Sequence, residues 1–265
     1  MAQTAERWQL AIVDDGSTDQ SFALAKSFAE KDARIIVLSQ KNKGTASARD
    51  LGYKTLECDY LAYLDADDEL APEYLDKMAT LIAENPSHVL YACNILYKFP
   101  DKEYVAWDYS QVSVVSLQDW GVSPDISMAG SIIRKKDYYS LGGFTGYDSY
   151  VEDLYLLVRF LVSGNAVIAP DALYRYHRIH RHHKSSAKLK VWRSAIASLE
   201  HIKSTVSMTP EQERVISSRI ELYRQYQREF LVESIKYGWH IVTKTVTMSK
   251  PYRILLGQAK RFLKK

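Results

Sequence analysis

The chain has 265 residues, of which 46% are hydrophobic and 25% are charged, values that are ordinary for a soluble globular protein. This length accommodates one large α/β domain, or one domain with a helical appendage. No apolar run is long enough to span a bilayer, and the N-terminus has no signal-peptide pattern. The two cysteines, Cys58 and Cys93, lack metal-ligand spacing, which favours buried free thiols and a reducing, cytoplasmic location.

The formal net charge of +3 conceals an uneven distribution. Residues 1–183 contain 18 Lys and Arg against 26 Asp and Glu, a net charge of −8. Residues 184–265 contain 17 against 6, a net charge of +11. The acidic part could hold a metal ion, whereas the basic part could face an anionic partner or form a solvated helical face.

In chain order, the first half alternates between strand and helix patterns, as in successive βαβ units. The predicted strands are 10–13, 34–39, 60–64 and 89–96, and the predicted helices are 19–31, 45–56 and 72–84. An irregular aromatic stretch, 97–120, is followed by 127–134, a Gly142-Gly143 break, a helix at 152–163 and a strand at 166–168. The remainder is predicted to be helical, with one helix at 188–206 and another that Thr209 caps, with Gln212 three residues later.

Two of these predicted strands end in acidic residues. Asp14 and Asp15 follow the first strand, and Asp65, Asp67 and Asp68 follow the third. Because ligands of open α/β sheets bind outside the carboxyl ends of the strands, the two acidic ends are expected to share one crevice. Carboxylates are hard oxygen ligands that suit Mg²⁺ or Mn²⁺, although solvated Asp clusters also occur in ordinary turns.

Several short motifs follow one another in a distinctive order. They are Ile12-Val-Asp-Asp-Gly-Ser-Thr-Asp19, Asn42-Lys-Gly44 with Ala48-Arg49 and Gly52, Tyr63-Leu-Asp-Ala-Asp-Asp68, Leu141-Gly-Gly-Phe144, Glu152-Asp153, and an Arg- and His-containing loop before Ser185-Ser186. Together they resemble the family 2 glycosyltransferases of the GT-A fold, over roughly residues 3–186. The resemblance implies a Rossmann-like α/β fold with a mixed, mostly parallel sheet and flanking helices, followed here by a helical C-terminal tail.

For the donor nucleotide, the resemblance implies that Asp14 and Asp15 contact the base and ribose. The same residues also fit a turn or helix-capping sequence, and both interpretations can hold together. Lys43 and Gly44 correspond to a loop that approaches the nucleotide, where glycine admits close backbone contact. Arg49 stands where the family has an arginine, and a surface salt bridge is the alternative role.

For the metal, the resemblance implies that Asp67 or Asp68 binds Mn²⁺ or Mg²⁺. Asp65 or Asp67 would then contact the ribose or the donor sugar. The cation would bridge the diphosphate and neutralise charge as it leaves. Three carboxylates so close together repel one another unless a cation compensates them.

For the acceptor, Glu152 and Asp153 match the acidic pair that begins a helix under the acceptor site. Asp153 would be the general base that takes a proton from the acceptor hydroxyl. Acidic residues in a first helical turn also stabilise the helix dipole, which is the alternative role. Gly142-Gly143-Phe144 is expected to shape the loop on the acceptor side.

The loop from His177 to His183 offers two registers for an Arg-x-His motif near the diphosphate. Arg178 with His180 is preferred to Arg175 with His177, because Ser185 and Ser186 then follow more closely. Arg178 would contact the donor and His180 would join the metal site. A solvated basic loop is the alternative, and a zinc site is disfavoured because partner cysteines are lacking.

The sequence departs from the family at its N-terminus and at Asp50. The first four residues match the end of the family's first helix, so residues 1–186 would form a domain without the first βα unit. Such a domain would expose a sheet edge and bind nucleotide less tightly. Asp50 replaces a usual Asn, and its extra charge would weaken diphosphate binding.

Residues 187–265 are expected to form a helical basic tail. Within it, 250–265 places apolar side chains at helical spacing among Lys and Arg. Such a helix either lies on an anionic membrane surface, near a lipid-linked acceptor, or docks on its own domain. Nucleic-acid binding is not expected, because no nucleic-acid fold accompanies the basic residues.

The expected activity is metal-dependent, inverting transfer from a nucleotide-sugar donor, a UDP-sugar, to a glycan or glycolipid hydroxyl. One alternative is a catalytically inactive relative that binds a partner or a membrane. A metal-dependent nucleotidyltransferase is the other, and it would require a Gly- and Arg-rich phosphate loop near the N-terminus, which the sequence lacks.

Overall fold

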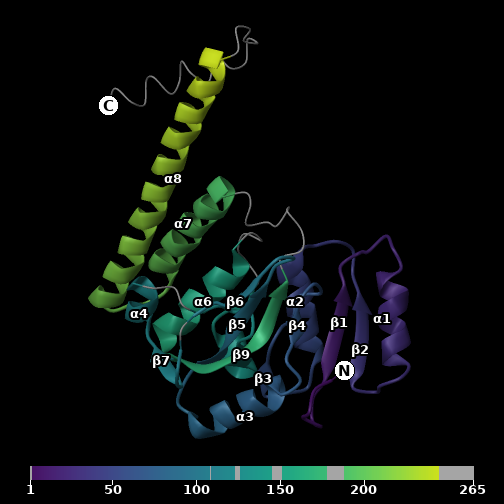
Figure 1. Cartoon of the computed structure of the whole chain (residues 1–265). Helices are drawn as coiled ribbons and strands as arrows, with labels where there is room; N and C mark the ends of the chain where they lie inside the picture. The colour runs from purple at the N-terminus through teal and green to yellow at the C-terminus, as the bar shows by residue number, and fades with distance from the viewer. Residues whose placement is uncertain (1, 108, 123–125, 145–150, 178–187, 245–265) are drawn as a thin grey trace.

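The computed structural model describes residues 2–107, 109–122, 126–144, 151–177 and 188–244, and for residues 233–244 only the backbone (Figure 1). The described chain forms two β-sheets with helices packed against them. Within these residues, no helix is long and apolar enough to cross a membrane. The basic segment 250–265 lies outside the described residues.

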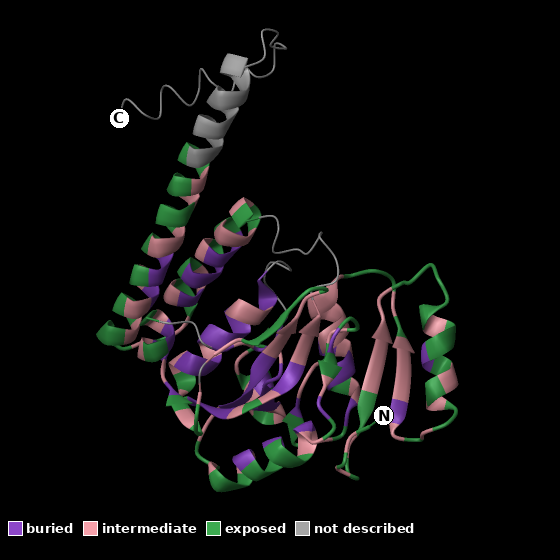
Figure 2. Cartoon of the chain, viewed as in Figure 1, coloured by how far each residue is buried: buried purple, intermediate pink, exposed green. Residues whose placement is uncertain are grey.

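The smaller sheet has two parallel strands, β1 (Leu10–Asp14) and β2 (Ile35–Ser39). They are joined through α1 (Ser21–Ala29), which Figure 1 places beside β2. In the described part of the chain, β1 pairs only with β2, and none of its residues is fully buried (Figure 2). Within these residues, the other edge of β1 therefore carries backbone groups without a strand partner.

The larger sheet has seven strands and is mixed. Its order is β3 (Tyr60–Leu61), β8 (Ile132–Arg134), β5 (Leu90–Lys98), β9 (Ala166–His177) and β4 (Glu69–Leu70), with β6 (Glu103–Val105) paired to β5 and β7 (Ser113–Val115) paired to β9. The pair β5–β9 is parallel and the other pairs of this sheet are antiparallel. The carboxyl ends of β5 and β9 therefore lie at the same edge.

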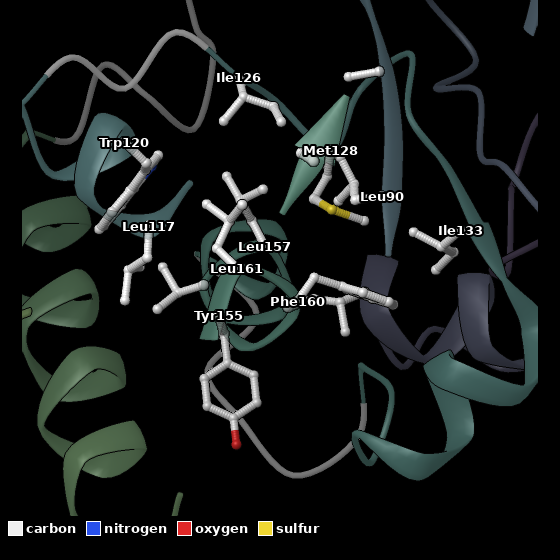
Figure 3. Packing of buried hydrophobic residues seen from close by; sticks show 14 of the residues in the cluster. Leu90, Leu117, Trp120, Ile126, Met128, Ile133, Tyr155, Leu157, Phe160 and Leu161 are labelled. Atoms are coloured by element: carbon white, nitrogen blue, oxygen red, sulfur yellow. The ribbon is translucent and has the colours of Figure 1, made fainter. Parts of the chain in front are cut away.

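Helices cover both faces of this sheet because side chains alternate along β5. Tyr91 and Cys93 belong to a cluster with α3 (Tyr74–Glu84), whereas Leu90 and Ala92 belong to a larger cluster with α6 (Glu152–Ser163). Figure 3 shows Leu157 and Leu161 of α6 between the sheet and Trp120, which lies on α4 (Leu117–Val122). The short helix α5 (Lys135–Ser140) follows β8.

The helices α7 (Lys188–Thr205) and α8 (Pro210–Lys244) form a hairpin, and α8 extends beyond α7 (Figure 1). Thr209 and Gln212 form the predicted capping box: the Gln212 amide donates to Thr209 Oγ1 at 3.2 Å, and the Thr209 amide donates to Gln212 Oε1 at 3.0 Å. The end of the hairpin where α7 turns into α8 is integrated in the larger core through Leu199, Ile202, Ile216 and Ile220.

Most predicted elements are present, and the differences have local causes. The predicted strand 60–64 is paired only at β3, after which the chain leaves the sheet toward the acidic cluster. The predicted strand 166–168 extends to His177 as β9, because register shifts beside Asn94 accommodate Pro170. The stretch 97–120, expected to be irregular, contains the end of β5, both β6 and β7, and the start of α4.

Candidate active site

The candidate site is organised around Arg49 on α2 (Thr45–Thr55). Its Nη2 donates to Asp65 Oδ1 at 2.7 Å, and its Nη1 donates to Glu152 Oε1 at 3.3 Å. The guanidinium also lies 3.7 Å from the centre of the Tyr63 ring. One arginine therefore joins the acidic residues after β3 to the start of α6, two segments far apart in the sequence.

The side chain of Arg49 is only 12% exposed, and Glu152 is 7% exposed. Burial alone would lower the pKa of Arg49, but Tyr63, Asp65 and Glu152 outweigh it, and the pKa is raised. Arg49 is therefore a permanent buried cation, held by a planar fork and by stacking on an aromatic face. The surface salt bridge considered for Arg49 is replaced by this buried network.

Asp153 lies beside this network, in the first turn of α6. Its Oδ1 accepts a hydrogen bond from the Leu154 amide at 2.8 Å. The pKa of Tyr63 is well above its usual value, first because of burial and then because of the charges of Asp153 and Asp65, against the effect of Arg49. The charges of both carboxylates therefore act on the same tyrosine.

The three aspartates after β3 have different surroundings. Asp68 is buried, and its Oδ2 accepts from Tyr174 Oη at 2.6 Å while its Oδ1 accepts from the His177 amide at 2.9 Å. Burial raises the pKa of Asp68 despite these hydrogen bonds, and the charges of Asp67 and Asp65 add to the effect. Asp68 thus anchors the acidic segment to β9, whereas the carboxylate of Asp67 is exposed to solvent.

No three His, Cys, Asp or Glu side chains come together as a preformed metal centre among the described residues. The acidic segment nevertheless fits a divalent cation, because Mg²⁺ and similar ions bind one or two carboxylates together with substrate phosphates. Asp67, with Asp65 two residues before it, supplies such oxygens at a site open to solvent. The predicted ligand His180 lies outside the described residues.

The two acids at the end of β1, Asp14 and Asp15, also have different hydrogen-bond partners. Asp15 Oδ1 accepts from the Lys43 amide at 2.9 Å, and its Oδ2 accepts from the Gly44 amide at 2.8 Å. Burial opposes ionisation of Asp15, but these hydrogen bonds and one from Gln40 lower its pKa. Asp15 therefore fixes the Lys43-Gly44 loop beside the end of β1, where Gly44 adopts a φ of 87° that favours glycine.

Asp14 is the other acid at this strand end. Its Oδ1 accepts from the Ser17 amide at 3.2 Å and its Oδ2 from Ser39 Oγ at 3.3 Å. The acidic end of β1 is connected to Arg49 through α2. Gly44, which Asp15 binds, directly precedes this helix, and Arg49 lies five residues after Gly44. Five helical residues span about 7.5 Å, so α2 connects the loop that Asp15 holds, beside the end of β1, to the Arg49 network after β3, although the two strands belong to different sheets.

Arg178 and His180, the preferred register of the basic loop, lie outside the described residues. In the other register, Arg175 Nη1 lies 3.5 Å from Glu69 Oε2, and His177 Nε2 lies 3.5 Å from Glu69 Oε1. These contacts hold the end of β9 against β4, next to Asp68.

Sequence reasoning missed the tyrosines that support the acids. Tyr63 stacks on Arg49 and Tyr174 binds Asp68. Tyr63 stands in the acidic motif 63–68 but was given no role, and Tyr174 belongs to none of the motifs. Asp50 was expected to weaken diphosphate binding, yet it is buried, bound by Tyr138 and paired with Lys54. Only the i, i+4 spacing of Asp50 and Lys54 was a visible signal of that pairing.

A mixed sheet covered by helices, beside a second small parallel sheet, defines an α/β protein. Residues 1–142 match the family model for glycosyl transferase family 2, and the chain belongs to this family. The resemblance noted in the sequence is thereby confirmed.

Curated relatives agree with this assignment. The chain is 24% identical over 243 residues to glycosyltransferase GlyA of Streptococcus pneumoniae, covering 85% of this chain and 34% of GlyA. It is 24% identical over 254 residues to the uncharacterized glycosyltransferase YibD of Escherichia coli, covering 89% of this chain and 71% of YibD. The chain thus spans about a third of the length of GlyA.

Solved structures show the same fold. Staphylococcus aureus TarS 1–349 in complex with UDP-GlcNAc superposes with a TM-score of 0.68 at 17% identity, covering 81% of this chain and 64% of TarS. The mannosyltransferase PcManGT of Pyrobaculum calidifontis, in complex with GDP-Man and Mn²⁺, gives a TM-score of 0.62 at 12% identity, covering 100% of this chain and 74% of PcManGT. The predicted GT-A fold is therefore confirmed. Its sheet is mixed rather than mostly parallel, because among the described strands only β1–β2 and β5–β9 pair in parallel.

Proposed function

We propose that this chain transfers a sugar from a UDP-sugar to a hydroxyl group of a glycan or glycolipid, with inversion and with the help of Mn²⁺ or Mg²⁺. The observation that supports this proposal is the bridge from Asp65 through Arg49 to Glu152, because it joins an acid that we assign to the donor side to the acidic pair that we assign to the acceptor side. The UDP-GlcNAc complex of TarS supports the donor class, and the Mn²⁺ complex of PcManGT supports the cation.

On the donor side, the proposal assigns base and ribose recognition to Asp14 and to the loop that Asp15 holds. The exposed carboxylate of Asp67, with Asp65, would hold the cation. When bound, the cation would neutralise the charge of the diphosphate that leaves. Asp68 supports this segment from beneath through Tyr174 and His177.

On the acceptor side, the proposal assigns proton transfer to Asp153. The acceptor oxygen attacks the anomeric carbon, its proton moves to the Asp153 carboxylate, and the bond from that carbon to the diphosphate breaks. A single displacement inverts the anomeric configuration. Glu152 is less suited to this role, because its ion pair with Arg49 stabilises its ionised form and binds it in place.

A helical unit from residue 187 would follow the transferase domain of residues 1–186. The basic segment 250–265 would place the site near a lipid-linked acceptor on an anionic membrane surface. A catalytically inactive binding protein is the competing function, and it is favoured by the edge of β1 that has no strand partner among the described residues.

The direct test incubates the chain with a panel of UDP-sugars, and with GDP-mannose as a comparison, and measures nucleotide release with and without EDTA. We expect release from a UDP-sugar in the presence of Mn²⁺ and its loss after chelation. A folded chain that releases no nucleotide from any donor, with Mn²⁺ and with glycan or glycolipid acceptors present, would favour the inactive binding protein instead.

A further inference from the structure

Asp50 follows Arg49 on α2 but points into a different environment. Its residue exposure is 7%, so its carboxylate is buried. Oδ1 accepts a hydrogen bond from Tyr138 Oη at 3.0 Å, and Oδ2 lies 2.6 Å from Lys54 Nζ. Both oxygens therefore have partners, and one of these partners is itself fully buried on α5.

The Tyr138 hydroxyl links Asp50 to the glycine turn on the acceptor side. It donates to Asp50 and accepts from the Phe144 amide at 3.1 Å. A carboxylate only accepts, so Asp50 fixes the direction in which this hydroxyl donates and leaves its lone pairs for Phe144. Burial is the first cause of the raised pKa of Tyr138, which keeps this hydroxyl protonated and able to donate.

The turn before Phe144 is shaped against the same tyrosine. Gly142 and Gly143 adopt φ values of 80° and 62°. A Cβ atom on Gly143 would lie 2.7 Å from Cζ and Oη of Tyr138. A larger residue at position 143 would therefore require the turn or the Tyr138 ring to move. The position of Phe144 thus follows from the position of Tyr138.

Phe144 in turn forms part of the aromatic wall around Arg49. Its ring centre lies 6.1 Å from that of Tyr63, and 5.5 Å from the Arg49 guanidinium carbon. Phe144 also packs at 5.7 Å on Tyr138. A continuous set of contacts therefore runs from Asp50 through Tyr138 and Phe144 to Arg49.

We propose that Asp50 is a positioning residue, which acts through Tyr138 and Phe144 to hold Arg49 between Asp65 and Glu152. This role rests on the proposed transferase function. It predicts that loss of the hydrogen bond from Tyr138 misplaces the acceptor-side acids while the nucleotide site beside β1 is kept.

The test compares four variants. Tyr138→Phe and Asp50→Leu remove the hydrogen bond, Asp50→Asn keeps an oxygen that accepts it, and Lys54→Ala removes only the partner on the side exposed to solvent. We expect kcat to fall about 10- to 100-fold in Tyr138→Phe and Asp50→Leu, the size of effect that a small misplacement produces. Asp50→Asn and Lys54→Ala should stay close to the unsubstituted chain, and the Kd for UDP should be unchanged in all four.

Hydrogen exchange of the Phe144 amide provides a readout that does not need catalysis. It should be faster in Tyr138→Phe and Asp50→Leu but not in Asp50→Asn or Lys54→Ala. If Asp50→Leu does not fold, the kcat and the Phe144 amide exchange of Tyr138→Phe decide whether the proposal holds. Unchanged kcat and exchange in Tyr138→Phe, or a parallel loss of UDP binding and kcat, would overturn the proposal. If the unsubstituted chain transfers no sugar, the proposed function fails, and the exchange data still decide whether Asp50 positions the turn.

Discussion

Asp153→Asn is expected to lower transfer by about 10²- to 10⁴-fold, the usual contribution of a general base, while UDP binding in the presence of Mn²⁺ is retained. Asp67→Asn is also expected to abolish transfer, but it should weaken metal-dependent UDP binding as well. The reason is the different role that we propose for each acid: the exposed carboxylate of Asp67 would hold the cation, whereas Asp153, in the first turn of α6, would take the acceptor proton.

The measurement is a pair of assays on each variant, steady-state transfer and calorimetric UDP binding with Mn²⁺. Asp101→Asn is a suitable control, because Asp101 is an exposed aspartate in the turn between β5 and β6 to which the proposal assigns no role. Equal loss of UDP binding in Asp67→Asn and Asp153→Asn would contradict the separation of roles.

Arg49→Met is expected to destabilise the folded chain by about 3–5 kcal/mol, because it leaves the buried carboxylate of Glu152 without this cation. Glu152 is 7% exposed, and the Arg49 contact to Asp65 and the stacking on Tyr63 are lost together. Arg49→Lys should recover little of this loss, since an ammonium cannot contact two carboxylates and an aromatic face as a planar fork does.

Chemical denaturation monitored by circular dichroism measures this effect. The double variant Arg49→Met with Glu152→Gln should be more stable than the sum of the two single effects predicts, because the uncompensated charge is gone. Arg228→Ala is the matched control: its ion pair with Glu221 is 62% and 59% exposed, so its loss should cost less than about 1 kcal/mol. A similarly small cost for Arg49→Met would mean that the network does not hold the site together.

Local patterns were sufficient to predict much of the fold. The alternation of strands and helices to residue 84, the helix that begins at Glu152 and the Thr209 cap follow from periodicity and capping chemistry, which act over a few residues. The length of β9 was missed because Pro170 ordinarily interrupts a strand. Pro170 fits within β9 because the pairing with β5 shifts register beside Asn94. This shift depends on the neighbouring strand, so the local sequence around Pro170 does not indicate it.

The candidate site was predictable in its acidic residues but not in their partners. Acids at strand ends are visible in the sequence, whereas the contact from Arg49 to Glu152 joins residues 103 positions apart. Likewise, Asp15 and Asp68 were expected to contact ligands, and the structure shows that each also anchors a neighbouring backbone segment. Such long-range pairings depend on how the helices pack, which a single sequence does not specify.

The most direct test of the central claim, that the strand ends form a metal-dependent nucleotide site, is calorimetric titration of UDP into this chain with and without Mn²⁺. The proposed site predicts saturable binding that requires the cation and that Asp67→Asn weakens. A chain that is folded by circular dichroism but binds no UDP, with or without Mn²⁺, would contradict the claim.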